Sequence, residues 1–207
     1  MEDKESFKSF GPTSTLTVQI KSKNIHSLIE KIKSEEKYNL SPGDIIIYSI
    51  CKNLKNFPEL NSKFDNGIML YPSIDLGYFI NIGRGSEIIN IKHADQKSLI
   101  ELSKEIKEMA LKYLHGELSD SEKQNGSFSI TNLFSFGVYS IIPPIYENQS
   151  AMISISSEFE DFESKDTEIL FIKRFNLTLS YDSRVADCQK ALQFLNRVKD
   201  ELENGFK

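Results

Sequence analysis

The chain has 207 residues, of which 39% are hydrophobic and 27% charged, and its formal net charge is −5. A chain of this length and composition can bury its own core, so residues 1–207 are expected to form a single domain. Lysine and arginine are dispersed, which argues against a nucleic-acid partner, because phosphate binding needs clustered basic residues. No apolar run approaches the ~18 residues of a membrane span, which excludes an integral membrane protein.

The start of the chain, MEDKESFKSF, is acidic and polar, unlike a secretory signal peptide. We therefore expect an intracellular protein, cytoplasmic in a prokaryote or in the mitochondrial matrix of a eukaryote. Cys51 and Cys188 form no CxxC pair and are expected to be free, buried thiols of a reducing compartment. His26, His93 and His115 do not have the spacing of metal ligands, so we expect solvated histidines and no metal site.

The first half of the chain predicts a strand, two helices and three short strands. Polar and apolar residues alternate over Thr15–Ile20, as in a half-buried strand. Asn24 is the expected cap of the next helix, and Ser41 is the expected cap of the helix after it, with Asp44 in its first turn. Gly83-Arg84-Gly85 is the expected hairpin turn between two of the short strands. The three strands are expected at Ile68–Tyr71, Leu76–Ile82 and Glu87–Ile91.

The second half repeats this alternation of helices and strands. The most regular helix is expected from Gln96 to Tyr113, with Asp95 as its cap and Gly116 after its end. The last helix is expected from Cys188 to Asn204, with one apolar face. Interleaved helices and strands favour an α/β fold, a two-layer sandwich in which helices cover a mixed sheet. The strands of this half are expected at Ser127–Leu133, Ala151–Ser156, Ile169–Lys173 and Phe175–Tyr181.

Three stretches, in this order, resemble the catalytic domain of the dihydrolipoamide acyltransferases of 2-oxoacid dehydrogenase complexes. They are NFPELNSKF with IDLGYFI, HADQKSLIELSKEIKEMA with GELSDSEKQNGSFSITNLFSFGV, and LTLSYDSRVADC. The resemblance extends from Pro12 to Asn204 and implies a fold like that of chloramphenicol acetyltransferase. It also implies a homotrimer, or an assembly of trimers, with active sites between subunits. Coenzyme A and dihydrolipoamide would be the substrates, with no covalently bound cofactor, and the residues that bind them stay unassigned.

The last of these stretches contains the family's catalytic motif, D-H-R-x-x-D-G, in the altered form DSRVADC. In the family the histidine takes the thiol proton, and a serine or threonine hydroxyl from across the subunit interface stabilises the oxyanion. Carried over by position, the degenerate site consists of Ser183 in place of the histidine, Asp187, and Thr131 as the oxyanion hydroxyl. Two glycines of the family are also replaced. Cys188 stands in place of the glycine of this motif, and Phe134 stands in place of a glycine shortly after Thr131.

The exchange of histidine for serine decides the functional expectation. An imidazole with a pKa of ~6.5 can accept a proton near neutral pH, whereas a serine hydroxyl stays protonated and cannot. A D-S-R-V-x-D motif is also found in protein X, the accessory core component of pyruvate dehydrogenase complexes, and DSRVAD resembles that motif more closely than the motif of the active acyltransferase. We therefore expect a non-catalytic or strongly impaired core subunit, a pseudoenzyme that assembles with the active acyltransferase core and other subunits of the complex.

Two other functions stay open at this stage. One is a CoA-dependent acyltransferase that transfers an acyl group between dihydrolipoamide and CoA with a non-standard base. The other is a protein that binds CoA or an acyl ligand without turning it over. Structural roles also compete with catalytic ones, since Asp187 could simply cap the last helix and Arg184 could simply form an ion pair.

Overall fold

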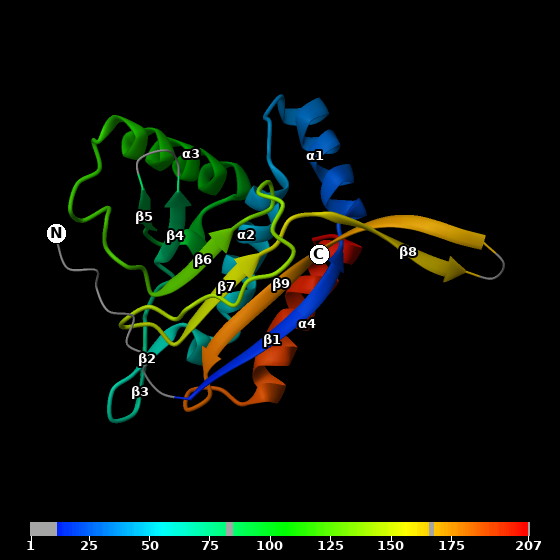
Figure 1. Ribbon diagram of the computed structural model, residues 1–207. Helices are drawn as coiled ribbons and strands as arrows, with labels where there is room; N and C mark the ends of the chain where they lie inside the picture. The colour runs from blue at the N-terminus through cyan, green and yellow to red at the C-terminus, as the bar shows by residue number, and fades with distance from the viewer. Residues whose placement is uncertain (1–11, 82–84, 166–167, 207) are drawn as a thin grey trace.

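The computed structural model describes residues 12–81, 85–165 and 168–206 (Figure 1). Helices and strands alternate along the chain, as the sequence predicts, and two 3-10 turns, η1 and η2, lie between them. In order the elements are β1 (Thr13–Lys21), α1 (Lys23–Glu36), α2 (Pro42–Leu54), η1 (Pro58–Leu60), β2 (Ser62–Phe64), β3 (Ile68–Leu70), β4 (Leu76–Asn81), β5 (Ser86–Ile91), η2 (Ala94–Gln96), α3 (Leu99–His115), β6 (Phe128–Asn132), β7 (Ala151–Ile155), β8 (Phe159–Lys165), β9 (Glu168–Asp182) and α4 (Cys188–Asn204).

Seven of these strands form one sheet in the order β1-β9-β7-β6-β4-β5, with β8 paired to the outer half of β9. The pairs β4–β6 and β6–β7 are parallel, whereas β9 runs antiparallel to β1, β7 and β8. The strands β2 and β3 form a separate small hairpin. The predicted mixed sheet is therefore confirmed.

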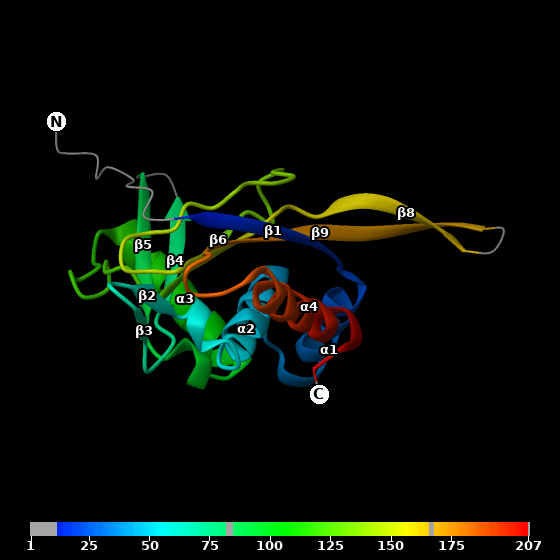
Figure 2. The same cartoon turned by 90° about the horizontal axis from the view of Figure 1, so that it is seen from below.

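The helices cover one face of this sheet, which gives the predicted two-layer sandwich (Figure 2). Against that face β9 buries Phe175, Leu177 and Leu179 completely. The helix α4 contacts β1, α1 and α2, and its predicted apolar face is buried, which is the main reason for its position. Among the described residues, no helix is long and apolar enough to cross a membrane.

The start of helix α2 packs closely against β6. Its start is the predicted one, since Ser41 Oγ accepts the N–H of Asp44 and the Asp44 carboxylate accepts the N–H of Ser41 at 2.7 Å. Gly43 in the first turn lies so close to the sheet that a Cβ there would overlap the side-chain amide of Asn132. This close approach holds β6, the strand that carries Thr131, directly beneath the start of α2.

The opposite face of the sheet is lined with hydroxyl and amide side chains. Thr178 of β9 shares a hydrogen bond of 3.0 Å with Thr17 of β1. The long connection after β6 crosses this face, where its main-chain oxygens accept hydrogen bonds from Ser154 Oγ (2.9 Å) and Asn176 Nδ2 (3.0 Å). Several buried polar groups on this face are thus paired, although Ser129 Oγ and Asn176 Oδ1 have no hydrogen-bond partner within the described residues. The sheet is polar on the side that carries no helix.

The predicted cap of α1 was wrong. The helix begins at Lys23, with Ser22 in the N-cap position, so Asn24 lies inside the first turn. Its side-chain amide instead donates to the main-chain oxygen of Glu203, near the end of α4. Asn24 therefore joins two helices, a tertiary contact that local propensity does not reveal.

The predicted cap of α3 was also wrong. Ser98 caps this helix and forms a capping box with Glu101, which satisfies two backbone N–H groups at once. Asp95 lies earlier, in η2, where its carboxylate pairs with Lys55 at 3.0 Å. The end of α3 is as predicted, because Gly116 takes the left-handed conformation with φ of 76°.

The predicted strands Ile169–Lys173 and Phe175–Tyr181 are one continuous strand, β9, and its partner β8 was not predicted. The charged residue between the two predicted strands, Arg174, is accommodated because it pairs with acidic side chains of β8. Beyond the helices, β8 and the outer half of β9 project as a two-stranded hairpin (Figures 1 and 2). The turn predicted at Gly83-Arg84-Gly85 lies largely outside the described residues, and the strands on either side of it pair antiparallel.

Candidate functional site

Ser183 follows the last residue of β9 and is exposed. Its main-chain N–H and its Oγ both donate hydrogen bonds to the main-chain oxygen of Pro12, each at 2.9 Å. Pro12 directly precedes β1, and the next residue, Thr13, forms the last register pair of β1 and β9 with Asp182. Ser183, which the resemblance predicts to replace the family's histidine, is therefore hydrogen-bonded to the chain's own backbone.

The residues on either side of Ser183 are held by an ion pair. Asp182 is buried, and its carboxylate accepts the main-chain N–H of Arg184 at 2.9 Å and lies 2.6 Å from Arg184 Nη2. This carboxylate raises the pKa of Arg184 above its already high ordinary value. The guanidinium carbon also lies 4.1 Å from the ring centre of Phe64 on β2. The interpretation of Arg184 as an ion-pair partner is confirmed.

Asp187 is the N-cap of α4, where its Oδ1 accepts the main-chain N–H of Lys190 at 2.7 Å. The next residue, Cys188, is exposed, so the prediction of two buried thiols was wrong for it and right for Cys51. The difference arises because the buried face of α4 begins only at Ala191, one turn later. Burial raises the pKa of the Cys51 thiol to about 12, so this thiol is not a nucleophile near neutral pH.

Thr131 lies on β6, on the polar face of the sheet, and is buried. It is in register with Ser154 of β7, which is in register with Thr178 of β9. From that level Ser183 is five residues, or about 16 Å, further along the strand direction, and two strand spacings add about 10 Å sideways. Thr131 and Ser183 of one chain are therefore about 19 Å apart and cannot act on the same atom of a substrate.

The three histidines lie away from Ser183. His26 on α1 was predicted to be solvated, but its Nε2 lies 2.6 Å from a carboxylate oxygen of Glu158, at the base of the projecting hairpin. Arg174 of β9, which pairs with the first residue of β8 at this base, is nine residues, or about 30 Å, from Ser183 along the strand. His115 ends α3 and is exposed, as is His93 before η2. Within the described ranges, no group of histidine, cysteine and acidic residues could hold a metal ion.

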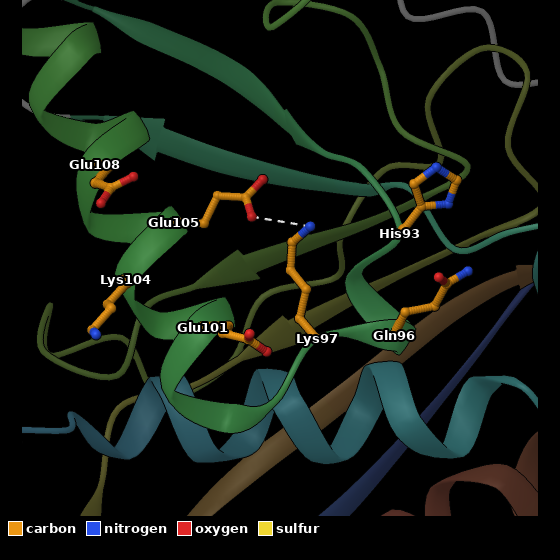
Figure 3. A pocket seen from close by; sticks show the side chains of 7 residues that line it. All are labelled: His93, Gln96, Lys97, Glu101, Lys104, Glu105 and Glu108. Carbon is orange, nitrogen blue, oxygen red and sulfur yellow. Dashed lines mark ion pairs between the residues drawn. The ribbon is translucent and has the colours of Figure 1, made fainter.

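An open groove of about 510 Å³ lies between η2 and α3 (Figure 3). Every residue that lines it has a polar or charged side chain, and Lys97 and Glu105 form an ion pair of 3.0 Å across it. Ligand sites for acyl groups are mostly apolar and enclosed, which this groove is not. It also lies at the β5 edge of the sheet, separated from β9 by β4, β6 and β7. The groove is therefore not part of the degenerate site.

The carboxylate of Glu158, the residue directly before β8, has three polar partners. It accepts from Ser22 Oγ at 2.6 Å, contacts His26 Nε2 at 2.6 Å and lies 3.2 Å from Lys173 Nζ. Burial alone would raise the pKa of Glu158, but the hydrogen bonds from Ser22, His26 and Lys173 outweigh it and lower the pKa below its ordinary value. These contacts fasten α1 to the base of the hairpin.

Glu158→Gln is expected to destabilise the fold by about 1 kcal/mol at pH 7. A carboxylate whose pKa is lowered by folding contributes stability above its unfolded pKa, and this contribution is lost as the pH falls through the folded value. The difference between wild type and variant should therefore shrink when urea unfolding is repeated near pH 3. Glu160→Gln, at an exposed position of β8, is the control and should change little at either pH. An equal loss at both pH values would contradict this role of the Glu158 carboxylate.

The family model for the 2-oxoacid dehydrogenases acyltransferase (catalytic domain) matches residues 5–206. The chain belongs to this family. The dihydrolipoyllysine-residue succinyltransferase component of the 2-oxoglutarate dehydrogenase complex from Bartonella vinsonii subsp. berkhoffii is 31% identical over 173 residues. That match covers 82% of this chain and 42% of the relative, so the chain spans less than half the length of such relatives.

Solved structures of the family have the same fold. A probable dihydrolipoamide acetyltransferase from Listeria monocytogenes superposes with a TM-score of 0.86 at 28% identity, covering 93% of this chain and 85% of that one. The dihydrolipoamide acetyltransferase of Azotobacter vinelandii also gives 0.86, at 22% identity over 94% and 82% of the two chains. A chloramphenicol acetyltransferase gives 0.63 at 14% identity, covering 93% and 89%. The predicted chloramphenicol-acetyltransferase-like fold is confirmed, whereas the roles of Ser183, Asp187 and Thr131 stay predictions.

Proposed function

We propose that this chain is a core subunit of a 2-oxoacid dehydrogenase complex in which acyl transfer is abolished or strongly impaired. The observation that carries the proposal is the side chain of Ser183, a hydroxyl that donates to the main-chain oxygen of Pro12. A hydroxyl in this position cannot take the proton of a thiol at neutral pH. In this reading Ser183 occupies the position of the general base without its chemistry.

The correspondence of positions has independent support. The Azotobacter vinelandii enzyme was studied for the role of a serine, a histidine and an asparagine in its catalytic mechanism. Thr131 and Asp187 stand at the same separations along the chain from Ser183 as that serine and that asparagine do from that histidine. A hydroxyl at the first position is kept, and the base is replaced. The proposal is therefore a site with its oxyanion hydroxyl but without its proton acceptor.

We further propose that the chain forms a homotrimer or an assembly of trimers. Thr131 and Ser183 lie too far apart in one chain to share a substrate, so a site that uses both positions must combine two subunits. The hairpin of β8 and β9 also exposes Phe162 (66%), Ile169 (65%) and Phe171 (84%). A two-stranded hairpin is marginally stable in water by itself, and these apolar side chains favour contact with a neighbouring copy. An active acyltransferase core with the same fold could take that copy's place.

In sedimentation at micromolar concentration, the wild-type chain is expected to be a trimer or larger. Burying an aromatic side chain is worth roughly 1.5–3 kcal/mol, so the double variant Phe162→Ser/Phe171→Ser should weaken association by about 10²-fold or more and release monomers. Leu111→Ser, at an exposed position of α3, is the matched control and should leave the assembly intact. A wild-type chain that sediments only as a monomer would overturn the proposed assembly.

A second candidate, a CoA-dependent acyltransferase with a non-standard base, is favoured by the retained hydroxyl of Thr131. A free thiol with a pKa of ~8.5 is a few per cent thiolate at pH 7, so transfer between dihydrolipoamide and CoA could proceed slowly without a base. A third candidate, binding of CoA or an acyl ligand without turnover, predicts retention of CoA in native mass spectrometry. The rate of acyl transfer by the assembled protein separates the first two candidates.

A further inference from the structure

We propose that Ser183 is a positioning residue that fastens the start of β1 to the end of β9. The inference goes beyond the proposed function, because it gives the serine a structural purpose of its own. Its main-chain N–H and its Oγ converge on one acceptor, the main-chain oxygen of Pro12, each at 2.9 Å. The hydroxyl thus adds a second bond to the contact that closes the β1–β9 ladder.

The start of β1, which follows the acceptor Pro12, and the end of β9, which precedes the donor Ser183, differ in how firmly they are held. The end of β9 is held by several hydrogen bonds. The N–H of Asp182 donates to the main-chain oxygen of Ser150 at 2.8 Å, and the side chain of Arg184 donates to the carboxylate of Asp182. The turn is closed by the N–H of Val185, which donates to the main-chain oxygen of Asp182 at 3.1 Å. Ser183 is therefore presented on a rigid turn, and its Oγ bond restricts little additional freedom.

The start of β1 is the more easily opened side. β1 lies at the edge of the sheet, and Thr13 and Thr15 are exposed. The terminal pairs of an edge strand open with little free energy, so their amides exchange with solvent through local fraying rather than global unfolding. A hydroxyl bond to Pro12, next to the last pair, should suppress this fraying.

A histidine at this position would not make the same bond. The Oγ of serine is one bond from Cβ, whereas the ring nitrogens of histidine lie further out and cannot reach the same oxygen in the same rotamer. Threonine keeps a hydroxyl at the γ position and can make the bond. Serine and threonine at position 183 can therefore make the hydrogen bond to Pro12, whereas alanine and histidine cannot. This difference gives a test that is independent of acyl transfer.

Amide hydrogen exchange over residues 13–17 of the assembled protein tests the inference, compared between wild type, Ser183→Ala and Ser183→Thr. One hydrogen bond corresponds to about a two- to twelve-fold change, so Ser183→Ala should accelerate exchange in this segment by that factor. Ser183→Thr should restore the wild-type rate, and exchange in α2, which reports the stability of the core, should be unchanged in both. Unchanged exchange in Ser183→Ala, failure of Ser183→Thr to restore it, or equal acceleration in α2 would each overturn the inference. None of these outcomes depends on whether the chain transfers acyl groups.

Discussion

Acyl transfer from acetyl-CoA to dihydrolipoamide by this chain is expected to be at least ~10²-fold slower than by a histidine-bearing relative. General acid–base catalysis by a positioned group contributes ~10²–10⁴ in rate, and Ser183 is proposed to stand at the position of that group. The hydroxyl of Ser183 donates to Pro12, and the chain's three histidines lie at positions 26, 93 and 115, far from it in the fold. A hydroxyl such as that of Thr131 can stabilise charge but cannot accept the thiol proton.

The pH dependence distinguishes a weak active site from one that lacks its base. Without a base, the rate follows the ionisation of the substrate thiol and should rise about tenfold per pH unit up to its pKa near ~8.5. A site that uses a histidine should instead level off above ~6.5. The measurement is kcat/KM between pH 6 and 9 for this chain and for the Azotobacter vinelandii enzyme. A turnover number within a few-fold of that enzyme, or a plateau near pH 7, would show that another group accepts the proton.

The elements that the sequence predicted well are those whose own residues carry the periodic signal. In α4 the apolar positions repeat on one face, and the core buries that face. In α2 the consecutive residues Ile45, Ile46 and Ile47 are all buried, as in a helix that is apolar on more than one side. The strand β8 gave no such signal, because its sequence FEDFESK alternates poorly and its acidic residues are balanced only by Lys21 and Arg174 on other strands. The ends of the helices were set by capping and by tertiary contacts, which propensity alone does not rank.

The candidate site divides in the same way. The assignment of Ser183, Asp187 and Thr131 to the site follows from a short motif and its spacing, and it stays a prediction. The hydrogen bond from Ser183 to Pro12 could not be predicted, because its partners are 171 residues apart and the acceptor is a main-chain oxygen that every residue possesses. The exposure of Cys188 was not predicted for a related reason. Whether the first residue of a helix is buried or exposed depends on where the neighbouring helices and strands end.

Ser183→His alone is expected to restore only part of the lost activity, leaving the rate at least ~10-fold below that of the histidine-bearing enzyme. The imidazole would stand between Asp182 and Arg184, whose ion pair already fixes the turn. It must still direct one nitrogen to the thiol within ~3 Å, and a misplacement of ~1 Å can cost ~10²-fold. The substitution also removes the Oγ bond to Pro12, so the start of β1 beside the new base would be less firmly held.

The neighbouring replacements limit the recovery in different ways. Cys188 is exposed at the first position of α4, where the family has glycine, so Cys188→Gly can be added without opening the core. Phe134 packs edge-on against the buried Phe175 with ring centres 5.7 Å apart. Replacing this partly buried ring by glycine would remove its packing against the core and free the backbone, so Phe134→Gly would confuse loss of folding with loss of activity.

The informative comparison is therefore between wild type, Ser183→His, Ser183→His/Cys188→Gly, and Ser183→Gln as a control of similar size without a basic nitrogen. Only the two histidine variants should gain an inflection near pH ~6.5 in kcat/KM, since only they carry a group that titrates there. The double variant should exceed the single one if the added side chain at position 188 crowds the new base. Full activity from Ser183→His alone would mean that the rest of the site is intact and lacks only a base. In that case the replacements at positions 134 and 188 would not reflect loss of catalysis, and the proposal of a non-catalytic subunit would rest on the serine alone.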